Sequence, residues 1–163
     1  MQTTASAERP DPRRNAYRDD LAAESLRGVV QAPRFVAGSR CQLIRSAVPL
    51  RRRPLATAGL DSEVLFGEVV TVYESVDGWA WGQLERDGYV GYLPADALAS
   101  EVRAPTHKVR ALGTFLYPEA GIKSPPLMHL SIGSPLAVVE TVDKLSRLAG
   151  GGFVVSRHLG EVG

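Results

Sequence analysis

The chain has little of what many function classes require. Its 163 residues include a single cysteine, Cys41, which excludes an intramolecular disulfide and a cysteine-rich zinc site. No apolar run is long enough to cross a bilayer. With 19 Lys and Arg against 18 Asp and Glu, the net charge of +1 gives no chain-wide field for nucleic acid or an anionic membrane. Partner recognition must therefore depend on local surfaces.

The N-terminal forty residues differ in composition from the rest. Residues 1–19 are rich in proline and arginine, which predicts a disordered, solvated tail. They contain no apolar segment of the kind found in secretory signals, so the chain as written is expected in the cytoplasm unless another route exports it to the periplasm or cell envelope. Asp20 is then expected to cap a short helix over residues 21–27 that ends at Gly28.

One segment occurs twice. Gly67 and Gly133 each precede an apolar strand that ends in Glu, and Gly91 and Gly152 each precede an aromatic residue, apolar positions and a closing Leu. The pattern predicts two β-units over residues 41–100 and 103–163. A unit of about sixty residues buries only ~60% of its unfolded surface. Each unit is therefore expected to pack against the other or against a further partner.

Within each unit, short β-branched and aromatic runs alternate with turn signals, which predicts an all-β fold. Asp77-Gly78 and Asp87-Gly88 are each expected to form a two-residue hairpin turn. Long loops are expected over residues 51–61 and 118–126. The predicted strands cover residues 41–48, 68–76, 79–85, 89–94, 109–117, 136–142, 145–149 and 153–155.

The order of these features resembles tandem bacterial SH3-type domains. The residues that carry the resemblance are Val48-Pro49-Leu50-Arg51, Gly67, Asp77-Gly78-Trp79 and Gly91-Tyr92-Leu93-Pro94, with Leu116-Tyr117-Pro118, Gly133 and Gly152-Phe153-Val154-Val155 in the second unit. The sequence of residues 79–94 and of residues 122–127 resembles the N-terminal half of NlpC-type cell-wall endopeptidases. Those papain-like enzymes cleave the γ-D-glutamyl bond of peptidoglycan stem peptides.

The resemblance implies two SH3-like β-barrels that hold a catalytic domain in cis, expected after Gly163, and that contact a stem peptide. The Asp-Cys-Ser-Gly nucleophile motif of that catalytic domain is absent from this chain. No catalytic residue is therefore assigned, and the chain is expected to have no peptidase activity.

Individual residues indicate binding rather than catalysis. Cys41 is expected to be a half-buried strand residue. His107, His129 and His158 lie far apart in the sequence and lack metal-ligand spacing. No metal or cofactor is expected. On a strand, Trp79 and Trp81 share one face, with one expected inward and the other exposed at an interface. The candidate binding residues are Tyr73, Trp79, Trp81, Tyr89, Tyr92 and, on a loop stiffened by two prolines, Lys123. For the loop at Lys123, a plain turn without a binding role is an equal alternative. The arginines at 51–53 are expected to form a solvated face.

These features support a non-catalytic targeting and substrate-gating module of a peptidoglycan γ-D-glutamyl-diamino-acid endopeptidase. The alternative is a free-standing two-barrel adaptor that binds a protein or a cell-wall peptide. An enzyme that uses Cys41 as its nucleophile is disfavoured, because no partner for the thiol is evident in the sequence.

Overall fold

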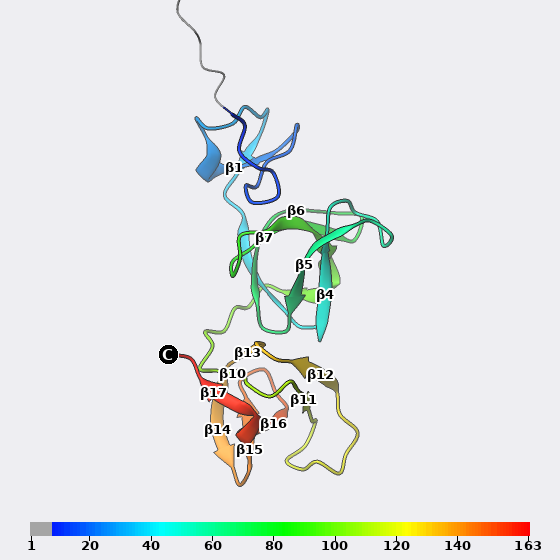
Figure 1. Ribbon diagram of the computed structural model, residues 1–163, viewed down its shortest axis with the longest axis vertical. Helices are drawn as coiled ribbons and strands as arrows, with labels where there is room; N and C mark the ends of the chain where they lie inside the picture. Colours follow the sequence, from blue (N-terminus) through cyan, green and yellow to red (C-terminus); the bar gives the residue numbers. More distant parts are fainter. Residues whose placement is uncertain (1–7) are drawn as a thin grey trace, which may run out of the picture.

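The computed structural model describes residues 8–163, which form three parts in a row along the long axis (Figure 1). An N-terminal segment lies at one end, a first β-barrel in the middle and a second β-barrel at the other end. The all-β, SH3-like fold class is confirmed. Residues 1–7, which belong to the predicted tail, lie outside the described residues.

The first barrel is one antiparallel seven-stranded sheet with the order β5-β4-β8-β7-β6-β3-β9. Side chains alternate along β7, so Ala80 and Leu84 point into the core. The other core residues are Leu43, Leu50, Val64, Val70, Leu93 and Ala97. The elements are β3 (Ser39–Leu43), β4 (Ala47–Arg51), β5 (Leu60–Leu65), β6 (Val69–Val76), β7 (Trp79–Leu84), β8 (Val90–Pro94), the 3-10 turn η2 (Ala95–Ala97) and β9 (Leu98–Ala99).

The second barrel is built from three small sheets, ordered β13-β10-β17, β11-β12 and β14-β15-β16. Its core consists of Val109, Leu116, Leu130, Leu136, Leu148, Val154 and Leu159. The elements are β10 (His107–Val109), β11 (Gly113–Leu116), β12 (Met128–Ser131), β13 (Pro135–Leu136), β14 (Val138–Val142), β15 (Leu145–Leu148), β16 (Phe153–Val155), the 3-10 turn η3 (Ser156–His158) and β17 (Leu159–Glu161).

The predicted N-terminal helix is wrong. Strand β1 (Ala22–Ala23) pairs in parallel with β2 (Phe35–Val36), and only the three-residue 3-10 turn η1 (Glu24–Leu26) follows β1. Asp20 does not cap a helix N-terminus, and its carboxylate instead accepts hydrogen bonds from the Arg18 side chain. A seven-residue helix is too short to be stable alone. Burial of this segment against the first barrel therefore overrides the helical propensity of its Ala and Leu residues.

The predicted solvated tail is also wrong over residues 13–18, which contact the first barrel. Ala16 is 1% exposed, and Val90 N–H of β8 donates a 2.8 Å hydrogen bond to Arg13 O. The Gln83 side-chain amide donates to Arg14 O at 3.0 Å. The segment therefore supplies hydrogen-bond partners to polar groups of the barrel that would otherwise require water.

Several predicted strands are interrupted. Residues 41–48 are split between β3 and β4, residues 109–117 between β10 and β11, and residues 136–142 between β13 and β14. Strands β5, β9, β12 and β17 were not predicted, and β5 begins inside the loop expected over residues 51–61. The Asp77-Gly78 turn is confirmed, with φ values of 53° and 82°. The Asp87-Gly88 turn is wrong, because Leu84 N–H donates to Tyr89 O at 2.8 Å and encloses a four-residue loop.

The two barrels meet at the β5–β6 turn. Phe66 leaves the first barrel and packs against the core of the second. Gly67 has a φ of 82°, and an added Cβ would lie 2.0 Å from Pro135 O, so no other residue fits this approach. Gln42 in β3 holds the linker by accepting from Arg103 N at 3.1 Å and donating to Arg103 O at 3.0 Å. The second barrel is therefore completed by a side chain of the first.

Replacing Phe66 with Ala should destabilise the second barrel by about 2 kcal/mol, less than the roughly 3–5 kcal/mol of a fully buried Phe, because Phe66 is only partly buried. Urea unfolding followed by NMR amide signals should then show the second barrel unfolding before the first. Phe115→Ala, at a 43%-exposed position of the second barrel, is the control and should cost less than ~1 kcal/mol. Coincident unfolding of both barrels at the wild-type midpoint would contradict the role of Phe66.

Candidate functional site

Trp79 and Trp81 both lie on the outer face of β7, opposite the core-facing Ala80. Trp81 is nevertheless only 3% exposed, because the N-terminal segment covers it. One Trp was expected to point inward and the other to be exposed. The inward placement is wrong, since neither Trp belongs to the barrel core. The cluster that buries Trp81 contains Ala16, Leu21, Ala23 and Val90, flanked by Leu26, Val36, Tyr73 and Tyr92.

Arg18 joins the N-terminal segment to this aromatic face. Its guanidinium carbon lies 4.5 Å from the centre of the Trp81 ring, within cation–π range. The guanidinium donates to Glu74 Oε1 at 2.7 Å, to Tyr92 Oη at 3.2 Å and to Asp20. Burial opposes its charge, but these hydrogen bonds outweigh burial and raise the pKa of Arg18. Arg18 therefore stays protonated and fixed over Trp81.

Beside this contact lies a groove of about 360 Å³ on the first barrel. It runs between the loop that follows β4, the Asp77-Gly78 hairpin and the N-terminal segment. Trp79 is its partly exposed aromatic wall. The lining residues are Arg18, Pro54, Glu74, Val76, Asp77, Trp79, Trp81 and Tyr92. The groove thus combines an aromatic surface with hydrogen-bonding groups of both charge signs.

The remaining predicted site residues lie outside this groove. Tyr73 packs with its ring centre 5.7 Å from that of Trp81, and burial raises the pKa of its hydroxyl. Tyr89 packs on the barrel core, with the Arg14 guanidinium 4.6 Å over its ring. Lys123 is exposed on the long loop of the second barrel. Sequence reasoning missed Arg18, because no local signal separates an arginine in a packed segment from one in a tail.

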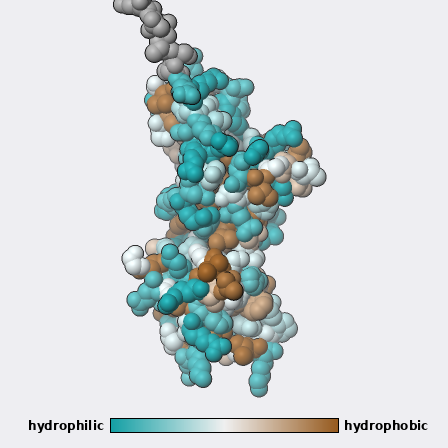
Figure 2. All heavy atoms as spheres, viewed as in Figure 1, coloured by the Kyte–Doolittle hydropathy of each residue, from teal (hydrophilic) through white to brown (hydrophobic). Residues whose placement is uncertain are grey.

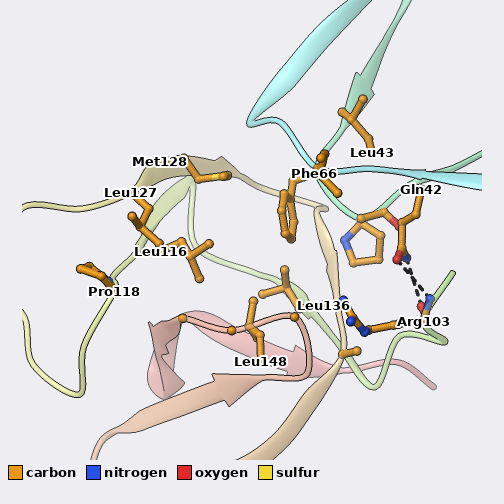
Figure 3. A pocket seen from close by; sticks show the side chains of 17 residues that line it. Gln42, Leu43, Phe66, Arg103, Leu116, Pro118, Leu127, Met128, Leu136 and Leu148 are labelled. Carbon is orange, nitrogen blue, oxygen red and sulfur yellow. Dashed lines mark hydrogen bonds between the residues drawn. The ribbon is translucent and has the colours of Figure 1, made fainter. Parts of the chain in front are cut away.

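A second cavity, of about 400 Å³, lies between the barrels (Figure 3). Phe66 points into it from the first barrel, and Leu136 and Leu148 face Phe66 from the second. Leu116, Leu127 and Met128 close another side. These are mostly the residues of the barrel junction, so this cavity belongs to the contact that joins the barrels.

The residues considered for catalysis have other roles. Cys41 is half-buried in β3, and burial raises the pKa of its thiol, which disfavours the thiolate that a nucleophile requires. His158 Nδ1 lies 2.7 Å from Thr114 Oγ1 inside the second barrel. Among residues 8–163, no group of three His, Cys, Asp or Glu side chains is placed to hold a metal ion. In the same range, no helix is long and apolar enough to cross a membrane.

Comparison with known proteins agrees with the fold. Residues 50–98, most of the first barrel, match the family model of the bacterial dipeptidyl-peptidase SH3 domain. The resemblance to a bacterial SH3 domain is confirmed for the first barrel. The structure is similar to an NlpC/P60 family protein from Bacillus cereus, with a TM-score of 0.59 and 15% identity over 75% of this chain. No curated protein sequence matches the chain.

This chain spans 56% of the length of the Bacillus cereus protein, and at 15% identity the likeness concerns the fold. The comparison therefore supports the SH3-like fold of the two barrels.

The contact between Arg18 and Glu74 should depend on pH. A hydrogen bond from Arg18 lowers the pKa of Glu74 below its ordinary value of 4.5. Because the pKa is lower in the folded state, the stabilisation is complete above pH 4.5 and is lost as pH falls through the folded-state pKa. Unfolding measured from pH 7 to pH 3 by Trp fluorescence should show this loss in wild type, with a smaller loss in Glu74→Gln.

Glu85→Gln is the matched control, because it removes a carboxylate paired with Arg40 on the same barrel at a 52%-exposed side chain. This variant should keep the wild-type pH profile. Equal acid sensitivity of Glu74→Gln and wild type would show that Glu74 does not hold the N-terminal segment.

Proposed function

We propose that this chain is the non-catalytic targeting and substrate-gating part of an NlpC-type peptidoglycan endopeptidase, and that the groove of the first barrel contacts the stem peptide. The observation that carries the proposal is the partly exposed Trp79 beside a fixed set of polar groups, in a groove of about 360 Å³. Binding sites for small peptides commonly combine an aromatic surface with a few oriented polar groups.

The chemistry of the groove suits a peptide that carries both amino and carboxylate groups. Both carboxylate oxygens of Glu74 already accept from Arg18 and Arg34. Asp77 is therefore the main acceptor for an ammonium or amide N–H, and the Tyr92 hydroxyl can bond to a carbonyl or carboxylate oxygen. Arg18 is already bonded to Glu74, Asp20 and Tyr92, so its main contribution is to hold the groove in shape. Preformed walls of this kind discriminate among stem peptides by fit, which requires only a difference in affinity.

The barrel junction supports a scaffolding part of the same proposal. Phe66, Gly67 and the Gln42–Arg103 hydrogen bonds fix one barrel against the other. A fixed pair of barrels can hold an NlpC-type catalytic domain in cis at a constant distance from the groove. A free-standing adaptor would bind the peptide equally well. The two are separated by measuring whether these barrels change the substrate range of such a catalytic domain.

The test is titration of the chain with a stem tetrapeptide, followed by Trp fluorescence and calorimetry. Trp79→Ala should weaken binding about tenfold, as expected when a central aromatic contact is removed, while the melting temperature changes little. Phe115→Ala, an exposed aromatic of the second barrel, should bind like wild type. Trp81→Ala should instead destabilise the first barrel by about 3 kcal/mol, because it empties a buried site.

Absence of saturable peptide binding by the wild-type chain would contradict the proposal. An unchanged affinity of Trp79→Ala would contradict the placement of the site in this groove.

A further inference from the structure

The groove of the first barrel has a counterpart in the second. The hairpin residues Asp77 and Asp143 have φ values of 53° and 54°. In each barrel a 3-10 turn, η2 or η3, directly follows the second strand after the hairpin, which is β8 or β16. Strand pairing places Trp79 beside Pro94 in the first barrel and Leu145 beside Val155 in the second. Leu145 therefore occupies the position of Trp79.

The two barrels share a glutamate at a second equivalent position but differ in which arginine neutralises its carboxylate. Glu74 faces Trp81 across a bulge and receives its cation, Arg18, from the N-terminal segment. In the second barrel Glu140 faces Arg147 at the equivalent register, and the two form a 2.9 Å ion pair within one hairpin. The second barrel therefore needs no external arginine at this face.

Two positions near the hairpin of the second barrel are basic where the first barrel has a neutral and an acidic residue. Gly78 of the first hairpin is replaced by Lys144 in the second, and Asp96 in η2 is replaced by Arg157 in η3. Both cations are exposed. The second groove thus contains two cations, Lys144 and Arg157, and keeps the acidic hairpin residue as Asp143.

This second groove is larger, about 950 Å³. Its apolar surface comes from Ile122, Val142, Leu145 and Val155, and its charged lining residues are Lys144, Arg157 and Asp143. Lys123 follows Ile122 on the same loop and is exposed. The described N-terminal segment lies at the opposite end of the molecule (Figure 1), so it does not cover this groove. Figure 2 shows separate apolar patches on one largely polar face of the molecule.

We propose that the groove of the second barrel is a separate binding site for an extended acidic peptide. Carboxylates of the peptide pair with Lys144 and Arg157, and an apolar side chain between them lies on Leu145, Val155 and Ile122. Asp143 at the hairpin tip disfavours a carboxylate there and so limits where the acidic residues fall. The site goes beyond the proposed function, because it lies in a different barrel and takes a different ligand.

The test uses the whole chain, labelled with ¹⁵N, and a blocked pentapeptide Glu-Asp-Leu-Asp-Glu as the probe. Saturable shifts should appear at the amides of residues 120–122, 142–145 and 155–157, and not at β7 or β8. The blocked peptide Lys-Lys-Leu-Lys-Lys should give none. The combined variant Lys144→Gln with Arg157→Gln should lower the affinity about three- to tenfold, as expected for two exposed ion pairs, and 0.5 M salt should have a similar effect.

Lys108→Gln, an exposed cation of the same barrel outside the groove, is the matched control and should bind like wild type. The exposed Ile122 offers an independent variant, and Ile122→Ser should weaken binding without unfolding the barrel. Equal binding of the two peptides, shifts spread over both barrels, or no saturable binding would each overturn the proposal. So would an equal loss of affinity in Lys108→Gln and the double variant.

Discussion

The Arg18 guanidinium, held between the Trp81 ring and the Glu74 carboxylate, is the contact on which the N-terminal half of the structure depends. It lies 4.5 Å from the ring centre and 2.7 Å from the carboxylate oxygen. Because the N-terminal segment brings this cation, an outer barrel face with a large indole becomes a buried interface, with Trp81 3% exposed. The same contact shapes one wall of the Trp79 groove, so folding of the segment and formation of the candidate site are linked.

The two barrels show how a repeated fold can acquire two different surfaces. Glu74 and Glu140 occupy equivalent bulged positions, yet one is neutralised from outside the barrel and the other by its own hairpin. At the rim, the second barrel has Lys144 and Arg157 where the first has Gly78 and Asp96. Each barrel has its own core, and the Phe66 contact joins the two barrels in one assembly. The two barrels therefore share a fold and differ in the charged residues around their grooves.

Much of the fold could be predicted from the sequence, because the alternation around Ala80 and the Asp77-Gly78 turn are local signals. The divided strands were harder to predict, since the turn at residues 44–46 has no glycine or proline to mark it. The N-terminal segment was misjudged for a different reason. Its packing depends on contacts such as Arg18 with Glu74, 56 positions apart, and no periodicity within residues 8–27 reports them. Of the predicted site residues, Trp79 and Tyr92 line the groove with Trp81, whereas Tyr73, Tyr89 and Lys123 do not.

The most direct test of this account is native-state hydrogen exchange of one amide that joins the N-terminal segment to the first barrel and one that closes the fold of the segment itself. Val90 N–H of the barrel donates to Arg13 O at 2.8 Å, and Ala23 N–H donates to Ala16 O at 2.8 Å within the segment. If the segment is an integral layer of the barrel, both amides should be protected to a similar extent as the central strands β6 and β7. Exchange of these two amides at the rate of an unfolded peptide, with the barrel still protected, would contradict the account.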